Sequence, residues 1–333
     1  MARVFGLSLI FFTAAACNDS TSSPVDSRPS DGASVDASPI VDTDLGEESS
    51  AVDDASTDAV PKHDAAYVQN PFITARPYQS HVPTHYDANQ PTPLLVMLHG
   101  YASNAAGHEA YFHLTELSDK HGFLYAYPDG TTDIFFQQFW NATDACCDIF
   151  KKNVDDVKYI NAVLDDMQAR YSVDAKRIFL VGHSNGGFLS YRMACDAALR
   201  IAAIVSLDGD NWKDISRCRP QEPVAILQIH GDMDGTVNYK GGNFPNLALY
   251  PSAHDSIMSW VTLNRCSTTV DTSTAAVDIS ADLAGNETTI ERWNSCHGGA
   301  AELWTVHSGV HQPTLAAGAT ELMWNFLAAH AKP

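Results

Sequence analysis

Short apolar runs alternate with stretches of helical periodicity over most of the chain beyond residue 67. Six runs of five to seven mostly apolar residues predict buried strands. Between two of them, apolar residues recur at intervals of three and four from Val157 to Met167, which predicts a helix with one apolar face. This alternation favours an α/β fold with a mostly parallel sheet and helices on both faces. The six expected strands cover 93–99, 122–127, 177–181, 201–207, 224–230 and 302–306.

The stretch GHSNG at 182–186 stands where such a sheet binds its ligands, just after a strand. It follows the run at 177–181 and precedes apolar residues at helical density, which is the strand-to-helix setting of a nucleophile elbow. A sharp turn of this kind strains the backbone at Ser184 and leaves no room for side chains at Gly182 and Gly186. The alternative is a serine that only caps the following helix.

The groups that could activate this serine come from two later turns. A serine hydroxyl is a poor nucleophile until a neighbouring base takes its proton, and in this arrangement the order along the chain is Ser, acid, His. The turn after 224–230 offers Asp232 and Asp234, and the turn after the last strand offers His307 and His311. Periodicity alone leaves both choices open.

The ability of the side chain to reach Ser184 favours His311 as the base. It lies past a glycine turn and can swing toward Ser184, whereas His307 is almost still in the strand. Asp208 and Asp210 follow the preceding strand and are possible acids in a shifted arrangement, but we expect them to cap or solvate their loop.

Acyl transfer also needs hydrogen-bond donors for the developing oxyanion. The backbone N–H of Asn185, directly after the nucleophile, is one candidate. The second is the N–H of Tyr101, in the loop after the first long strand. We expect His99, at the start of that loop, to hydrogen-bond locally rather than to titrate in catalysis.

The first residues have the pattern of an export signal, expected over 1–16. One basic residue precedes an apolar run that is shorter than the roughly 18 residues of a membrane span. The small residues before Cys17 are similar to the lipobox of bacterial lipoproteins, which predicts lipid attachment at Cys17; ordinary signal-peptidase cleavage is the alternative. Residues 17–66, rich in Asp, Ser, Ala and Thr, predict an acidic, flexible tether, and 67–333 the catalytic domain.

Charge and cysteine content narrow the class of protein. A formal net charge of −20 argues against nucleic acid as a partner, because a polyanion requires clustered Lys and Arg. Of seven cysteines, six remain once Cys17 is set aside, an even number that suits disulfides in an oxidising compartment. No C-x2-C is present to support a metal site.

Several longer motifs carry a resemblance to a known group of proteins. They include LLVMLHGYASNA at 94–105, FWNATDACC beginning at 139, VDAKRIFLVGHSNGGFLSYRMAC ending at 195, and IHGDMDGTVNY at 229–239. With them the chain resembles the secreted polyhydroxybutyrate depolymerase and feruloyl esterase relatives among the α/β-hydrolases. The resemblance implies that fold, no cofactor and no metal. It places the acid at Asp234 and the base at His311, and it departs from the family in the turn HSGVHQP, which lacks a Trp.

The same resemblance implies a disulfide pattern. Cys266 is expected to pair with Cys296. Cys146 and Cys147 are expected to reach separately to Cys195 and Cys218, in either of two pairings.

Four aromatic residues past the second strand have two interpretations. They could line an acyl pocket or belong to the core, and the sequence favours neither. They are Phe135, Phe136, Phe139 and Trp140.

These observations predict an extracellular or cell-surface serine carboxylesterase, monomeric and attached to a membrane only through its lipid. Ser184 would attack the ester, His311 would take its proton, and Asp234 would orient the imidazole. The expected substrates are feruloyl or acetyl esters of plant polysaccharide, with polyhydroxybutyrate or its oligomers as the alternative. A peptidase of the same fold, and a surface binding protein that kept the scaffold, are the rivals from other classes.

Overall fold

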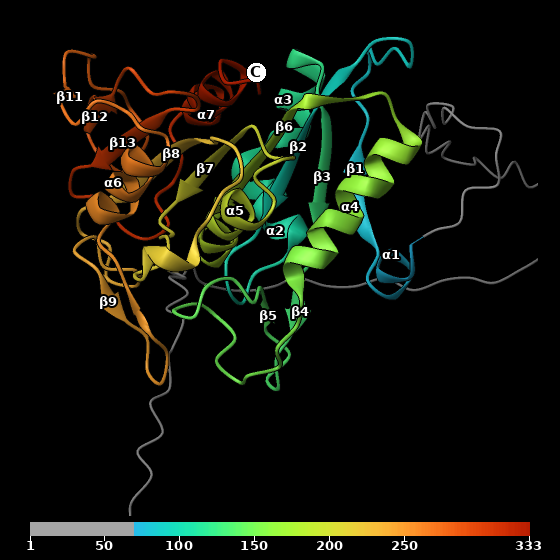
Figure 1. Ribbon diagram of the computed structural model, residues 1–333, viewed down its shortest axis with the longest axis horizontal. Coiled ribbons are helices and arrows are strands. Elements are labelled where there is room, and N and C mark those ends of the chain that lie inside the picture. The colour runs from blue at the N-terminus through green and yellow to red at the C-terminus, as the bar shows by residue number, and fades with distance from the viewer. Residues whose placement is uncertain (1–69) are drawn as a thin grey trace, which may run out of the picture. The chain divides into compact units, whose positions relative to one another are not determined.

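The computed structural model of the protein describes residues 70–333 (Figure 1). The expected signal peptide at 1–16, the lipid site Cys17 and the tether at 17–66 lie outside the described residues.

A nine-stranded sheet forms the centre of the described domain, in the order β1-β3-β2-β6-β7-β8-β13-β12-β11. Six neighbouring strands run parallel: β3, β2, β6, β7, β8 and β13. At the edges, β1 pairs antiparallel with β3, β12 with β13, and β11 with β12. The strands of this sheet are β1 (Tyr78–His81), β2 (Thr92–Leu98), β3 (Leu124–Pro128), β6 (Val173–His183), β7 (Ala203–Leu207), β8 (Ala225–Gly231), β11 (Val270–Asp271), β12 (Thr288–Trp293) and β13 (Ala301–Val306). Two small hairpins are β4–β5 (Thr131–Thr132, Gln138–Phe139) and β9–β10 (Gly242–Asn243, Leu249–Tyr250).

The six runs expected as strands are the six parallel strands, so the predicted α/β fold is confirmed. Their apolar character follows from burial on both faces: in β2, Leu94 and Val96 face one core, and Leu95 and Met97 face the other. Register is fixed by this packing, with Leu95 opposite Phe179 of β6.

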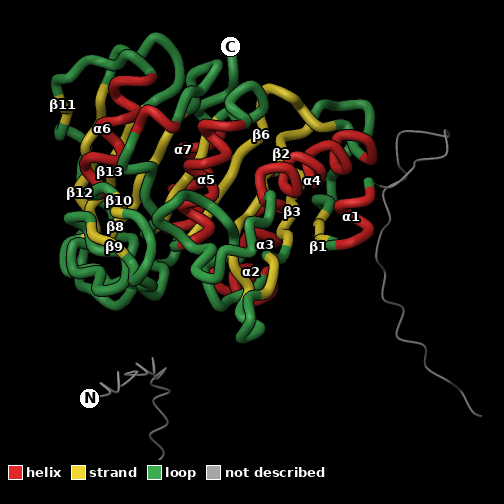
Figure 2. Tube along the Cα trace, turned by 60° about the horizontal axis from the view of Figure 1, so that its bottom comes forward, coloured by secondary structure: helices red, strands yellow, loops and turns green. Residues whose placement is uncertain are grey.

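Helices cover both faces of the sheet, as expected (Figures 1 and 2). The helices α1, α4, α5 and α6 pack with the core of Leu94, and α2, α3 and α7 with the core of Leu95. Their bounds are α1 (Pro71–Ala75), α2 (Ala105–Phe112), α3 (Leu114–His121), α4 (Asp156–Arg170), α5 (Asn185–Asp196), α6 (Ala253–Leu263) and α7 (Ala319–Ala328). The periodic stretch from Val157 to Met167 lies within α4. Within residues 70–333, no helix has both the length and the apolar character needed to cross a membrane.

The disulfides agree with one expectation and correct another. Cys266 pairs with Cys296. Cys195, at the end of α5, pairs with Cys218, their Cα atoms 5.0 Å apart. Because these two satisfy each other, the expectation that Cys146 and Cys147 reach separately to them is wrong. Instead, Cys146 and Cys147 are bonded to each other.

Candidate active site

Ser184 stands on a sharp turn between β6 and α5, at the carboxyl end of a central strand. Its backbone has φ 54° and ψ −119°, a strained conformation for a residue with a side chain. A Cβ on Gly182 would overlap the carbonyl of Gly186, and one on Gly186 would overlap the carbonyl of Leu98. The Ser184 side chain makes no capping hydrogen bond to α5, which contradicts the alternative of a simple helix cap.

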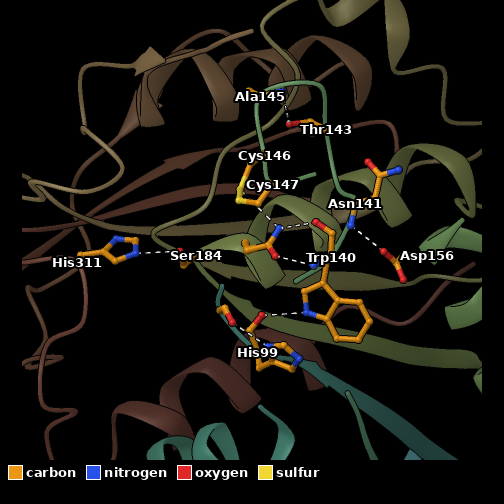
Figure 3. The surroundings of a disulfide bond; sticks show 12 residues. His99, Trp140, Asn141, Thr143, Ala145, Cys146, Cys147, Asp156, Ser184 and His311 are labelled. Atoms are coloured by element: carbon orange, nitrogen blue, oxygen red, sulfur yellow. Dashed lines mark hydrogen bonds between the residues drawn. A yellow bond between two sulfur atoms is a disulfide. The ribbon is translucent and has the colours of Figure 1, made fainter. Parts of the chain in front are cut away.

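A continuous hydrogen-bonded array links Ser184 to two side chains from turns that follow other strands. Figure 3 shows its first step, from Ser184 to His311. The Oγ of Ser184 lies 2.9 Å from Nε2 of His311, and Nδ1 of His311 lies 2.7 Å from Oδ2 of Asp234. His311 follows β13 and Asp234 follows β8, so all three side chains meet at the carboxyl edge of the sheet. An imidazole held between a hydroxyl and a carboxylate can accept the hydroxyl proton.

The neighbouring candidates Asp232 and His307 form a separate pair. Nδ1 of His307 lies 3.1 Å from Oδ2 of Asp232, and the two side chains are 52% and 33% exposed. Asp232 also accepts a hydrogen bond from the backbone N–H of Ser308. The structure therefore brings Asp234 and His311, rather than this pair, to Ser184.

Asp234 is held ionised by its surroundings. Burial of the carboxyl opposes ionisation, but hydrogen bonds from His230 and His311 outweigh it and hold the pKa of Asp234 well below its ordinary value. Its Oδ1 accepts the backbone N–H groups of Thr236 at 2.7 Å and Val237 at 2.9 Å. A carboxylate fixed in this way can orient an imidazole and stabilise its charged form.

Asp208 and Asp210 do not solvate their loop, because both are fully buried, and their hydrogen bonds go to other segments rather than capping that loop. Oδ1 of Asp208 accepts the backbone N–H of Gly231, and Oδ1 of Asp210 accepts the hydroxyl of Ser256. The second carboxyl oxygen of each has no partner within the described chain. Burial raises the pKa of Asp208 to about 7 and that of Asp210 to about 6. Neither has a hydrogen bond to His311.

Two backbone donors are free beside the serine. Among residues 70–333, the N–H groups of Tyr101 and Asn185 have no hydrogen-bond acceptor. The loop of Tyr101 passes close to the nucleophile, since a Cβ on Gly100 would lie 3.5 Å from Cβ of Ser184. These N–H groups are the two expected as oxyanion donors, and the arrangement can offer both to a carbonyl oxygen bound at the serine.

His99 shapes the loop of Tyr101, as expected. Its Nδ1 donates to the carbonyl of Gly100 at 2.8 Å, and its Nε2 accepts the N–H of Gly130 at 2.9 Å. Burial lowers the pKa of His99, which keeps the ring neutral.

Two further histidines support the array and were not singled out from the sequence. His183 donates from Nε2 to the carbonyl of His311 at 2.8 Å; burial and the neighbouring histidines hold its pKa well below the ordinary value. His230 lies behind Asp234, its Nε2 3.4 Å from Oδ2 of that residue and 2.8 Å from the carbonyl of Val237. Their positions inside the GHSNG and HGDMDG motifs were the available signal.

Among the residues that the structure describes, two groups of side chains have ligand atoms close enough to hold a metal ion: His183, Asp208 and His311, and Asp208, His230 and Asp234. The ring nitrogens of all three histidines are already hydrogen-bonded to protein atoms. The contacts of these groups therefore favour a hydrogen-bonded array over an ion site.

The four aromatic residues past β3 divide into two kinds. Phe139 and Trp140 are buried and belong to the core. Phe135 and Phe136 are exposed, at 65% and 85%, on the tip of the β4–β5 hairpin. The interpretation as an enclosed acyl pocket has no support in either pair.

Sequence comparison matches residues 140–254, which contain Ser184 and Asp234, to the phospholipase/carboxylesterase family model. The chain has an α/β-hydrolase fold, and part of it is similar to carboxylesterases. The chain is 30% identical over 149 residues to a bifunctional acetylxylan esterase/xylanase of Neocallimastix patriciarum, and 27% identical over 253 residues to feruloyl esterase B of Piromyces equi. These alignments include 45% and 74% of the chain, but only 20% and 43% of the respective relatives.

A solved structure supports the assignment of the fold. The acetyl xylan esterase from Aspergillus awamori superimposes with a TM-score of 0.53, covering 74% of this chain and 93% of that one at 14% identity. The expected resemblance to feruloyl esterase relatives and the α/β-hydrolase fold are thus both confirmed.

Proposed function

We propose that the protein is a serine carboxylesterase in which Ser184, His311 and Asp234 form the catalytic triad. The observation that carries this proposal is the unbroken array from the strained Ser184 to the ionised Asp234. His311 takes the proton of Ser184 as its Oγ attacks the ester carbonyl, and the N–H groups of Tyr101 and Asn185 bind the oxyanion. His311 then protonates the leaving alcohol. In the second half of the reaction His311 takes a proton from water, which attacks the acyl-enzyme, and returns a proton to Oγ of Ser184 as the acid leaves. The residues present require no cofactor or metal for these steps.

The proposed substrates are feruloyl or acetyl esters of plant polysaccharide. Support comes from two relatives, a feruloyl esterase and a bifunctional acetylxylan esterase/xylanase. We also propose that the protein is exported and acts at the cell surface or outside it as a monomer, with Cys17 carrying the lipid. The three disulfides support an oxidising compartment.

One observation favours a second candidate, a hydrolase of polyhydroxybutyrate or its oligomers. Ile134, Phe135 and Phe136 form an exposed apolar tip on the β4–β5 hairpin. Exposed apolar clusters are typical of surfaces that contact an apolar partner, such as an aliphatic polyester.

The substrate proposal is tested by comparing kcat/KM for methyl ferulate and for a 3-hydroxybutyrate dimer ester, with Ser184→Ala as the blank. We expect the ferulate ester to be preferred. A preference for the hydroxybutyrate ester would transfer the assignment to the second candidate.

A further inference from the structure

The segment Gln138–Cys147 contacts Asn185 and the loop that carries Tyr101. Figure 3 shows Trp140 of this segment beside His99. It begins at β5, runs through Trp140 and ends at the Cys146–Cys147 disulfide. We call residues 138–147 the strap. The sequence suggested only that its aromatic residues could line a pocket or belong to the core.

The strap engages both polar atoms of the Asn185 side chain. The backbone N–H of Trp140 donates to Oδ1 of Asn185 at 2.7 Å, and Nδ2 of Asn185 donates to the carbonyl of Trp140 at 2.9 Å. Nδ2 also lies 3.5 Å from Sγ of Cys146. Asn185 is fully buried, so its side chain cannot exchange these contacts for hydrogen bonds to water. The contacts therefore fix the residue whose backbone N–H is the first proposed oxyanion donor.

The strap also holds the loop of the second donor, on both sides of Tyr101. The indole Nε1 of Trp140 donates to the carbonyl of His99 at 3.0 Å, and the N–H of Ala102 donates to the carbonyl of Gln138 at 2.9 Å. The indole also packs on the His99 ring, with 5.0 Å between centroids. One segment therefore contacts both halves of the proposed oxyanion hole.

The strap itself is anchored to helices behind it. Arg192 of α5 donates from Nη1 to the carbonyls of Asn141 and Ala142, at 2.9 and 2.8 Å. The N–H of Asn141 donates to Asp156, which opens α4, at 2.7 Å. Anchors of this kind make the strap a rigid support rather than a mobile lid.

We propose that the strap positions the two oxyanion donors relative to each other, with Trp140 and the Asn185 side chain as positioning residues and the Cys146–Cys147 disulfide closing its end. This inference rests on the ester-hydrolase function proposed above. Since donors act only when aimed at the oxygen of the transition state, a loosened strap should lower kcat more than it raises KM.

The deciding experiment compares Trp140→Phe with Trp260→Phe. Both indoles are fully buried, but Nε1 of Trp260 has no partner within residues 70–333, so only the first change removes a hydrogen bond. With 4-nitrophenyl acetate as substrate, we expect Trp140→Phe to lower kcat about tenfold, less than the roughly 100-fold cost of losing a whole donor. KM should stay nearly constant, and inhibition by phenylboronic acid should weaken by a similar factor, because its tetrahedral adduct uses the same donors.

A second pair of variants keeps the test decisive if Trp140→Phe does not fold. Cys146→Ser/Cys147→Ser should lower kcat in the same way. Its control is Cys266→Ser/Cys296→Ser, because that disulfide joins the α6–β11 loop to the β12–β13 loop before the start of β13, at the opposite edge of the sheet from Ser184.

The proposal is overturned if each variant and its control lower kcat equally, or if the strap variants change only the melting temperature. Fluorophosphonate titration of active sites corrects every kcat for inactive protein. A wild-type protein that hydrolyses no ester, or a Ser184→Ala variant as active as wild type, would instead overturn the proposed function itself.

Discussion

The hydroxyl of Ser184 faces a base from another strand instead of capping its own helix. The strained φ of 54° is what allows this orientation, and the surrounding glycines are what allow the strain. At the residue scale, the chemistry depends on which of two similar side chains contacts the serine. Asp234 and His311 belong to the array, whereas Asp232 and His307, two and four positions away, pair with each other.

Asp232 and Asp234 provide a matched pair of carboxylates for testing this point. We expect Asp234→Asn to lower kcat by about 10⁴, because the imidazole would lose the partner that fixes its tautomer and stabilises its charge. Asp232→Asn should change kcat only a few-fold, since Asp232 pairs with the largely exposed His307. Steady-state kinetics on both variants check this. Equal losses in the two would contradict the choice of acid.

The buried Asp208 makes a prediction about stability and pH. Burial raises its pKa in the folded protein from an ordinary value of 3.8 to about 7. Between these values the folded state keeps a proton that the unfolded chain releases, so this carboxyl lowers the free energy of unfolding as pH rises from about 4 to about 7.

Asp208→Asn removes that ionisation and keeps an oxygen for the N–H of Gly231. The free energy of unfolding of the variant, relative to that of wild type, should rise by about 1 kcal/mol or more between pH 5 and pH 8, since one pKa unit corresponds to ~1.4 kcal/mol. Urea unfolding at the two pH values measures the difference. If the difference in the free energy of unfolding between variant and wild type stays constant or narrows from pH 5 to pH 8, Asp208 is already ionised at pH 5.

At the scale of elements, the elbow depends on close packing between β2, β6 and α5. Gly186→Ala should cost about 3 kcal/mol in the free energy of unfolding, because its Cβ would overlap the Leu98 carbonyl. Gly235→Ala is the control, as a Cβ there meets no atom within 4 Å. Urea titration of both variants gives the comparison. Similar small losses in the two would mean that the elbow is not tightly packed.

The elements were predictable because burial on both faces makes each parallel strand a continuous apolar run. Polar residues directly after those runs could be picked as candidate site residues, since the carboxyl ends of parallel strands lie at one edge of the sheet. The sequence could not show that Cys146 bonds to Cys147, because pairing depends on which thiols the loops bring together. It also gave no sign that Trp140 joins His99 to Asn185, a contact between three separate segments.

At the scale of the whole molecule, about half of the net charge of −20 lies before residue 67, outside the described domain. The proposed lipid at Cys17 predicts that the full-length protein expressed in a bacterium incorporates labelled palmitate. Cys17→Ala should abolish the label and release the protein from the membrane fraction, because the acyl chain would have no thiol to join. Labelling that persists in the variant, or never appears in wild type, would rule out the lipid anchor.

The central claim, that Ser184 is a nucleophile activated by His311, is tested most directly by mapping a fluorophosphonate adduct by mass spectrometry. We expect one adduct, on Ser184, that is absent in Ser184→Ala. Labelling should be at least about 10³-fold slower in His311→Ala, as removing a triad base has effects of this order or larger, and near wild-type in His307→Ala. An adduct on another residue, or equal labelling rates in the two histidine variants, would contradict the account.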